Sequence, residues 1–192
     1  MRDRFSTSAL PLAVVFIAVS GSAAFAHPGH GGGLADGLAH PFTGIDHMLA
    51  MVAVGLWAAQ LGGRAIFPLP LAFPLMMAAG AALGMNGVAM PWTEIGIVAS
   101  VVVLGAMVAV GVRASLALSV ALVGVFAIFH GYAHGSEFPG SASPWLYGAG
   151  FIAATLVLHA IGIAIGMVTQ RPFAMRTAGG AIAAAGLLLF VA

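Results

Sequence analysis

The chain has 192 residues, of which 61% are hydrophobic and only 6% are charged, and its mean hydropathy of +1.10 indicates an integral membrane protein. Six arginines against five acidic residues leave a net charge of +1, which gives no indication of a nucleic-acid partner. Cysteine is absent, so disulfides, thiolate metal sites and cysteine nucleophiles are excluded, and a bound metal must have nitrogen and oxygen ligands.

Residues 1–26 have the layout of a secretory signal peptide. Arg2 and Arg4 precede an apolar run over residues 9–19, and residues 24–26 (Ala-Phe-Ala) form the small-x-small pattern of a cleavage site. Because the apolar run is short for a membrane span, we expect cleavage after Ala26; the alternative is an uncleaved first transmembrane helix.

Residues 27–44 predict a Gly- and His-rich leader on the periplasmic side. Cleavage would make His27 the new N-terminus, and its free amine beside an imidazole, with His30 close by, can chelate a metal ion. The alternative is a flexible segment in which these two histidines are incidental.

Residues 45–192 predict an all-α domain, a polytopic bundle of about six transmembrane helices. The expected spans are residues 45–61, 66–84, 93–111, 115–134, 146–168 and 174–191. Turn-forming residues separate these spans, and Pro68, Pro70 and Pro74 predict that the second span is kinked or begins late.

The arginines set the expected orientation of the spans. Beyond the signal peptide they occur only in the first, third and fifth inter-helix loops, as Arg64, Arg113, Arg171 and Arg176. By the positive-inside rule these loops face the cytoplasm and the mature N-terminus faces the periplasm, in agreement with a cleaved signal peptide.

The fourth span carries a histidine cluster at its outer end. The stretch "FHGYAHGSE", residues 129–137, places His130, His134 and Glu137 at about 0°, 40° and 340° around a helix, which is one narrow stripe. Two imidazoles four residues apart, with a carboxylate three residues further on, can chelate a divalent ion. The alternative is that helix–helix hydrogen bonds and the aqueous interface satisfy these groups.

The start of the first span supplies further ligands at the same expected depth. The stretch "HPFTGIDH", residues 40–47, contains His40, Asp46 and His47, and an ionised Asp46 inside the hydrocarbon region needs a partner. A cation meets that need, so the two stretches together predict a metal site. Nitrogen and oxygen ligands favour Ni(II), Co(II) or Zn(II) over Cu(I). His159 lies about 20 Å along the fifth span, where it can accept the ion or relay a proton.

The two stretches resemble the signature motifs of the HupE/UreJ family of nickel and cobalt permeases. The first motif, H-x5-D-H, corresponds to His40, Asp46 and His47 in this sequence. The second motif, F-H-G-x-A-H-G-x-E, corresponds to residues 129–137. The resemblance extends over the whole chain. It implies a non-enzymatic secondary importer of Ni²⁺ or Co²⁺ in the bacterial inner membrane, without a prosthetic group. The implied partners are the metal ion, the lipid bilayer, and a periplasmic metal donor or a cytoplasmic nickel or cobalt chaperone.

Two other functions use the same ligands. A zinc-dependent intramembrane hydrolase of a lipid amide or ester would hold Zn²⁺ with three histidines and polarise a water with a carboxylate. A periplasm-facing metal sensor or chaperone would bind the ion without transporting it. Transport is the primary hypothesis, because either alternative leaves His159 without a role.

Overall fold

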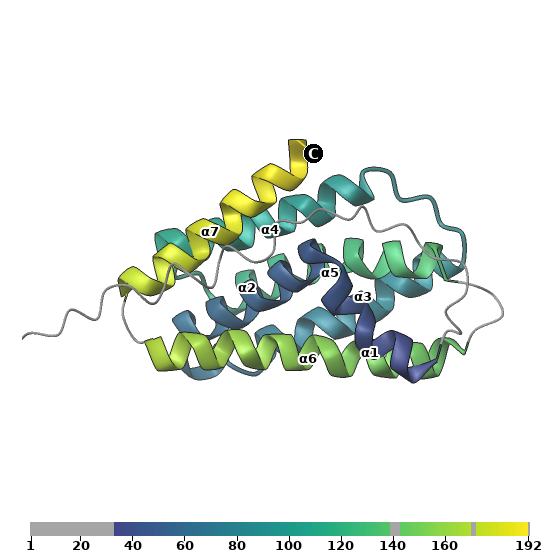
Figure 1. Cartoon of the computed structure of the whole chain (residues 1–192), viewed down its shortest axis with the longest axis horizontal. Helices are drawn as coiled ribbons and strands as arrows, with labels where there is room; N and C mark the ends of the chain where they lie inside the picture. Colours follow the sequence, from purple (N-terminus) through teal and green to yellow (C-terminus); the bar gives the residue numbers. More distant parts are fainter. Residues whose placement is uncertain (1–32, 139–142, 170–171, 192) are drawn as a thin grey trace, which may run out of the picture.

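The structure is a computed structural model that describes residues 33–138, 143–169 and 172–191, and within these ranges helices are the only regular secondary structure (Figure 1). The predicted signal peptide, His27 and His30 lie outside the described residues. The elements in chain order are α1 Leu34–Thr43, α2 Ile45–Leu61, the short 3₁₀ helix η1 Gly63–Ala65, α3 Pro68–Met85, α4 Thr93–Val110, α5 Leu116–Ser136, α6 Pro144–Thr169 and α7 Pro172–Val191. The predicted all-α fold is confirmed.

The helices have the length and hydropathy of membrane spans. Five of them, α3 to α7, are long and apolar enough to cross a bilayer, and α1 with α2 forms a sharply bent pair that makes a sixth candidate. The six expected spans correspond to α2 to α7 and differ from them by only a few residues at each end. The protein is therefore a multi-pass membrane protein.

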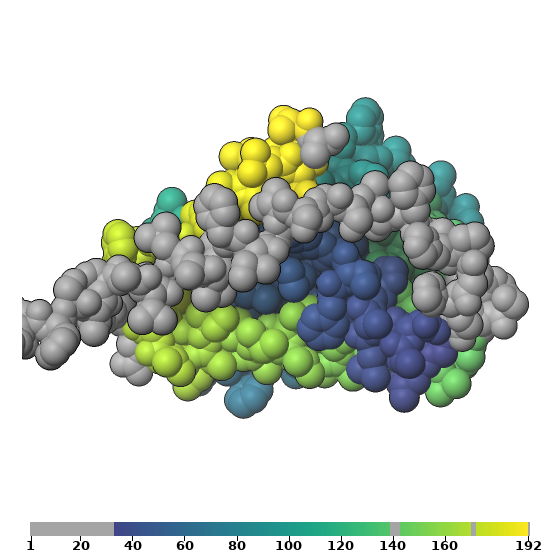
Figure 2. All heavy atoms as spheres, in the orientation of Figure 1, coloured from purple at the N-terminus to yellow at the C-terminus, as the bar shows by residue number. Residues whose placement is uncertain are grey.

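The sequence analysis assigned residues 34–43 to the Gly- and His-rich leader and predicted no helix there. They form α1, which meets α2 at an angle of 85° across the single residue Gly44. A Cβ at Gly37 would overlap the Tyr147 carbonyl, and a Cβ at Gly150 would overlap the Leu34 carbonyl, so glycine allows the backbones of α1 and α6 to touch. This contact, which local sequence does not reveal, holds α1 on the surface of α6 (Figure 2).

Glycines also set the spacing of the membrane-spanning helices. A Cβ at Gly80 would overlap the Ile128 carbonyl between α3 and α5, and a Cβ at Gly55 would overlap the His159 carbonyl between α2 and α6. Inside lipid, helices associate mainly through such close van der Waals packing, because the surrounding hydrocarbon is as apolar as the helices themselves. The bundle is therefore held at fixed interhelical distances by backbone contact.

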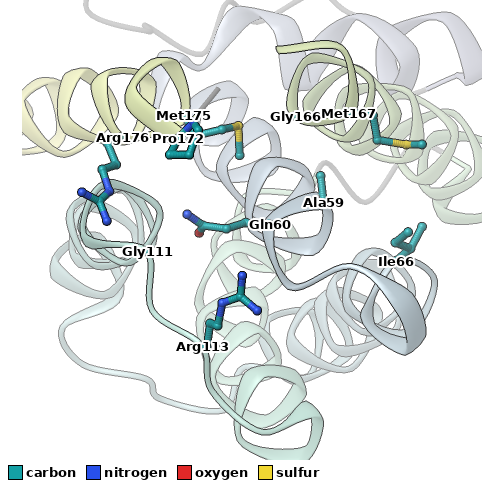
Figure 3. Close-up of a pocket in the computed structure, with 10 residues that line it drawn as sticks. All are labelled: Ala59, Gln60, Ile66, Gly111, Arg113, Gly166, Met167, Pro172, Met175 and Arg176. Carbon is teal, nitrogen blue, oxygen red and sulfur yellow. The ribbon is translucent and has the colours of Figure 1, made fainter. Parts of the chain in front are cut away.

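The end of the bundle that carries the described arginines contains a cavity of about 610 Å³. Gln60 of α2, Arg113 before α5 and Arg176 of α7 surround it (Figure 3). The Gln60 side chain donates a hydrogen bond to the Val108 carbonyl at 3.1 Å, which ties the end of α2 to the end of α4. The arginines and the histidine motifs thus occupy opposite ends of α2 and α5.

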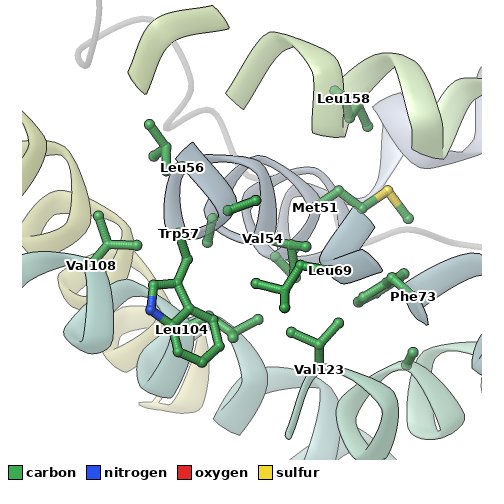
Figure 4. Packing of buried hydrophobic residues seen from close by; sticks show 14 of the residues in the cluster. Met51, Val54, Leu56, Trp57, Leu69, Phe73, Leu104, Val108, Val123 and Leu158 are labelled. Carbon is green, nitrogen blue, oxygen red and sulfur yellow. The ribbon is translucent and has the colours of Figure 1, made fainter. Parts of the chain in front are cut away.

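The apolar core lies between these two ends and is centred on α2. Its large buried side chains come from five helices: Met51, Val54, Leu56, Trp57, Leu69, Phe73, Leu104, Val108, Val123 and Leu158 (Figure 4). The indole Nε1 of Trp57 donates to the Val112 carbonyl at 3.1 Å, so its polar atom is satisfied at the link between α4 and α5.

Substitution of Gly80 by alanine tests the close helix contact. We expect Gly80→Ala to push α3 away from α5 and to lower the stability of the folded protein by about 1–3 kcal/mol, as overpacking does in other cores. The measurement is thermal unfolding of the detergent-solubilised protein by circular dichroism. Gly180→Ala on α7 is the matched control, because a Cβ there meets no atom within 4 Å. Equal melting temperatures for the two variants would contradict the contact.

Candidate metal site

The two histidine motifs meet where α1, α2 and α5 come together. His40 lies in the last turn of α1, Asp46 and His47 lie in the first turn of α2, and His130 and His134 lie on successive turns near the end of α5. The 85° bend between α1 and α2 folds His40 back toward the α5 histidines. The structure therefore brings together five of the side chains that the sequence analysis selected.

The four imidazoles are in direct contact, and we call them the imidazole cluster. The ring centroids of His47 lie 4.6 Å from those of both His130 and His134. The His40 centroid lies 4.7 Å from that of His134 and 6.4 Å from that of His47. Each ring therefore lies within contact distance of at least one ring from a different helix.

Aromatic side chains of α6 form an apolar wall against the cluster. The Phe151 ring centroid lies 4.5 Å from that of His134 and 5.7 Å from that of His40, and the Tyr147 centroid lies 5.9 Å from that of His40. His130 is fully buried and His47 is 8% exposed. Electrostatic interactions are stronger in such surroundings than in water, so unpaired polar atoms in the cluster are costly.

Asp46 fixes the proton of His47. Its Oδ1 accepts the backbone N–H of His47 at 2.7 Å and lies 2.8 Å from His47 Nδ1. A carboxylate can only accept, so Nδ1 carries a proton, and in the neutral ring the lone pair is on Nε2, which is buried without a hydrogen-bond partner. A Cβ at Gly44 would lie 3.0 Å from that same oxygen, which explains why a glycine precedes this pair. The carboxylate–histidine arrangement is the one that supports metal-ligating histidines in proteins.

The α5 histidines also present ring nitrogens without partners. His130 Nε2 lies 2.8 Å from the Ser100 hydroxyl, whereas His130 Nδ1 and His134 Nε2 are buried without a hydrogen bond. A buried polar atom left unpaired costs about 1–3 kcal/mol. Three histidines of one cluster therefore each hold a nitrogen that a cation would satisfy.

The cluster does not have the geometry of a formed metal centre. Among the described residues, no three His, Asp or Glu side chains are positioned to hold one ion. The His47–His130 and His40–His134 ring pairs are packed edge to face, at 88° and 89°. Coordination would require these side chains to rearrange, and the metal site remains a prediction.

Two of the selected side chains lie apart from the cluster. Glu137 is exposed at the C-cap of α5, directly after Ser136, the last residue of the helix. His159 lies deeper, on α6, and the Phe73 ring is interposed, with its centroid 5.4 Å from those of both His130 and His159.

Sequence analysis missed Ser100 and Phe73, which touch the histidines from α4 and α3. Ser100 offered a signal, because it is a polar residue in the middle of an apolar span and such a group must find a partner. Phe73 offered none, since an apolar ring in an apolar span is ordinary.

Comparison with known proteins matches residues 14–189 to the model of the HupE / UreJ protein family. The chain belongs to the HupE/UreJ family. This HupE/UreJ chain is 46% identical over 176 residues to Protein HupE of Rhizobium leguminosarum bv. viciae, and the alignment covers 88% of the chain and 91% of that relative. No solved structure matches it. The family is generally associated with nickel and cobalt transport, and neither match supports the hydrolase alternative.

The role of Asp46 can be tested by metal binding. We expect Asp46→Asn to weaken Ni²⁺ binding by about 10- to 100-fold, because an amide can donate to Nδ1 and so stabilise the wrong tautomer of His47. The measurement is calorimetric titration of the purified protein with Ni²⁺. Asp36→Asn, the same change on α1 outside the cluster, should bind like the parent. If both variants bind alike, Asp46 does not support a metal ligand.

Proposed function

We propose that this HupE/UreJ protein is a secondary importer of Ni²⁺ or Co²⁺ in the bacterial inner membrane, and that the ion first binds at the imidazole cluster. The observation that carries the proposal is the contact of four imidazoles from three helices, with unpaired ring nitrogens, in a membrane protein of a metal-transporter family. The ion is the transported substrate, and no prosthetic group or catalytic residue is part of the proposal.

In this proposal His40, His47, His130 and His134 replace the water shell of the ion. Imidazoles without thiolates suit Ni²⁺ and Co²⁺, and the carboxylate of Asp46 compensates part of the incoming charge. Glu137, exposed at the end of α5, would attract the hydrated ion to the entrance. His27 and His30 would collect ions before that step, if the cleaved N-terminus carries them near the entrance.

The distribution of charge supports an inward direction. The described arginines lie at the end opposite the imidazole cluster, and Arg113 and Arg176 border the cavity there. By the positive-inside rule this end faces the cytoplasm and the cluster faces the periplasm. The cavity therefore lies at the end through which the ion would leave.

His159 is a suitable second station for the ion or for a proton. It is 1% exposed and makes no hydrogen bond through either ring nitrogen. Thr155, one turn earlier on α6, also has a buried hydroxyl without a partner. The Pro70 carbonyl of α3 lies near the His159 ring, and it lacks the usual helical hydrogen bond from position 74 because Pro74 has no N–H. Together these groups offer polar atoms on the side of Phe73 that faces away from the imidazole cluster.

The driving force must come from outside the protein, since the sequence contains no nucleotide-binding motif. The membrane potential favours entry of a divalent cation into the cytoplasm, and an intracellular chelator would keep the free ion low. Transport also requires that each station bind weakly enough to release the ion.

Uptake into liposomes tests the proposed function. We expect the parent protein to accumulate radioactive nickel or cobalt, and we expect Asp46→Ala and His130→Ala each to reduce accumulation by at least about tenfold, because each loses a ligand or its support. Asn86→Ala, a change at an exposed side chain at the end of α3, should transport like the parent.

Two outcomes would contradict the proposal. Accumulation by both cluster variants at the parent rate would remove the imidazole cluster from the pathway even if transport occurs. Zinc-dependent turnover of lipid without metal uptake would favour the hydrolase, and equilibrium metal binding without uptake would favour a sensor or chaperone.

The second station has a separate test. We expect His159→Ala to slow uptake while leaving the equilibrium affinity for Ni²⁺ unchanged, because the first binding site is intact on the other side of Phe73. Leu158→Ala, which shortens a neighbouring buried side chain of α6, controls for lost packing. Uptake by His159→Ala at the rate of the Leu158→Ala control would exclude a relay at this position.

A further inference from the structure

Ser100 makes two short contacts that together restrict the protonation of His130. It lies in the middle of α4 and is fully buried. Its hydroxyl oxygen lies 2.6 Å from the Ile97 carbonyl oxygen of the preceding turn and 2.8 Å from His130 Nε2 on α5. The hydroxyl has a single proton for these two neighbours.

Only one assignment of protons satisfies both contacts. The Ile97 carbonyl has no proton, so a separation of 2.6 Å between two oxygens requires the Ser100 hydroxyl to donate to it. The hydroxyl oxygen can then only accept, and Nε2 of His130 must donate its N–H. The neutral ring therefore carries its lone pair on Nδ1, which is the buried atom without a partner.

We propose that Ser100 is a positioning residue that holds His130 in the Nε2–H tautomer, so that Nδ1 is the atom offered to the transported metal ion. The inference rests on the proposed function, because it assigns the ligand atom of that same site. It complements Asp46, whose carboxylate accepts a hydrogen bond from Nδ1–H of His47 and so leaves the lone pair of that ring on Nε2. Two chemically different partners thus leave opposite nitrogens without a partner on two rings that are packed edge to face.

The contact to His130 is more than the internal hydrogen bond of a helical serine. Ser119 of α5 is also fully buried, and its hydroxyl donates to the Ser115 carbonyl of its own helix at 3.0 Å. That bond alone satisfies the Ser119 proton. Ser119 therefore matches Ser100 in residue type, burial and helix-internal bonding, and serves as a control.

The experiment uses the full protein in detergent micelles or nanodiscs, with Ni²⁺ as the probe. We expect Ser100→Ala to bind Ni²⁺ about 10- to 100-fold more weakly than the parent, because the ring is no longer held in one tautomer. Ser119→Ala should bind within about twofold of the parent. Ser100→Thr keeps the hydroxyl and should recover most of the affinity.

Nitrogen-15 spectra of labelled histidine give a readout that a structural role would not move. In the metal-free parent, the His130 signals, assigned by their loss in His130→Gln, should report a proton on Nε2 and a bare Nδ1. In Ser100→Ala they should report a mixture of the two tautomers. Monodisperse gel filtration of each variant identifies any that fails to fold.

The outcomes separate this inference from the proposed function. A proton on Nδ1 of His130 in the parent would overturn the assignment, whether or not the protein transports metal. Parent-like Ni²⁺ affinity in Ser100→Ala, with binding still dependent on His130, would overturn the role of Ser100 and leave the imidazole cluster as the metal site. Absence of Ni²⁺ binding and uptake in the parent would instead contradict the proposed function, and the tautomer would still be decided by the spectra.

Discussion

A polar atom inside a bilayer has no water to bond to, and this constraint explains the arrangement around the imidazole cluster. Every ring nitrogen in such a place must meet a protein group or a ligand. Asp46 is hydrogen-bonded to Nδ1 of His47, and Ser100 is hydrogen-bonded to Nε2 of His130. The second nitrogen of each ring has no hydrogen-bond partner. In the proposed function, the nitrogens that remain without a partner are the ones that would bind the ion.

The glycine contacts make this arrangement possible. Backbone contact at Gly37, Gly55 and Gly80 brings α1 and α2 against α6 and α3 against α5. With larger residues at these positions the helices would separate, and imidazoles from three helices would not reach ring contact. Glycine lowers the intrinsic propensity of a segment to form a helix. Its abundance is nevertheless favourable in a bundle whose stability depends on close approach of the helix backbones.

The sequence predicted those features that depend on local pattern. Hydropathy located α2 to α7, and the two motifs identified His40, His47, His130 and His134, which lie in contact. It missed α1, which packs on α6, and it placed Glu137 on one stripe with His130 and His134, whereas Glu137 lies apart from the cluster at the C-cap of α5. Ser100 and Phe73 depend on which helices become neighbours, and a single sequence does not encode that choice in any local spacing.

The distance along the chain between the two histidine motifs has a consequence for biogenesis. His40 and His47 are synthesised long before α5, so the early segment carries only part of the imidazole cluster. Contacts between segments that are far apart along the chain form late, because closing the long loop between them costs chain entropy. In the proposed function, a nascent chain therefore lacks the complete imidazole cluster until α5 has been inserted.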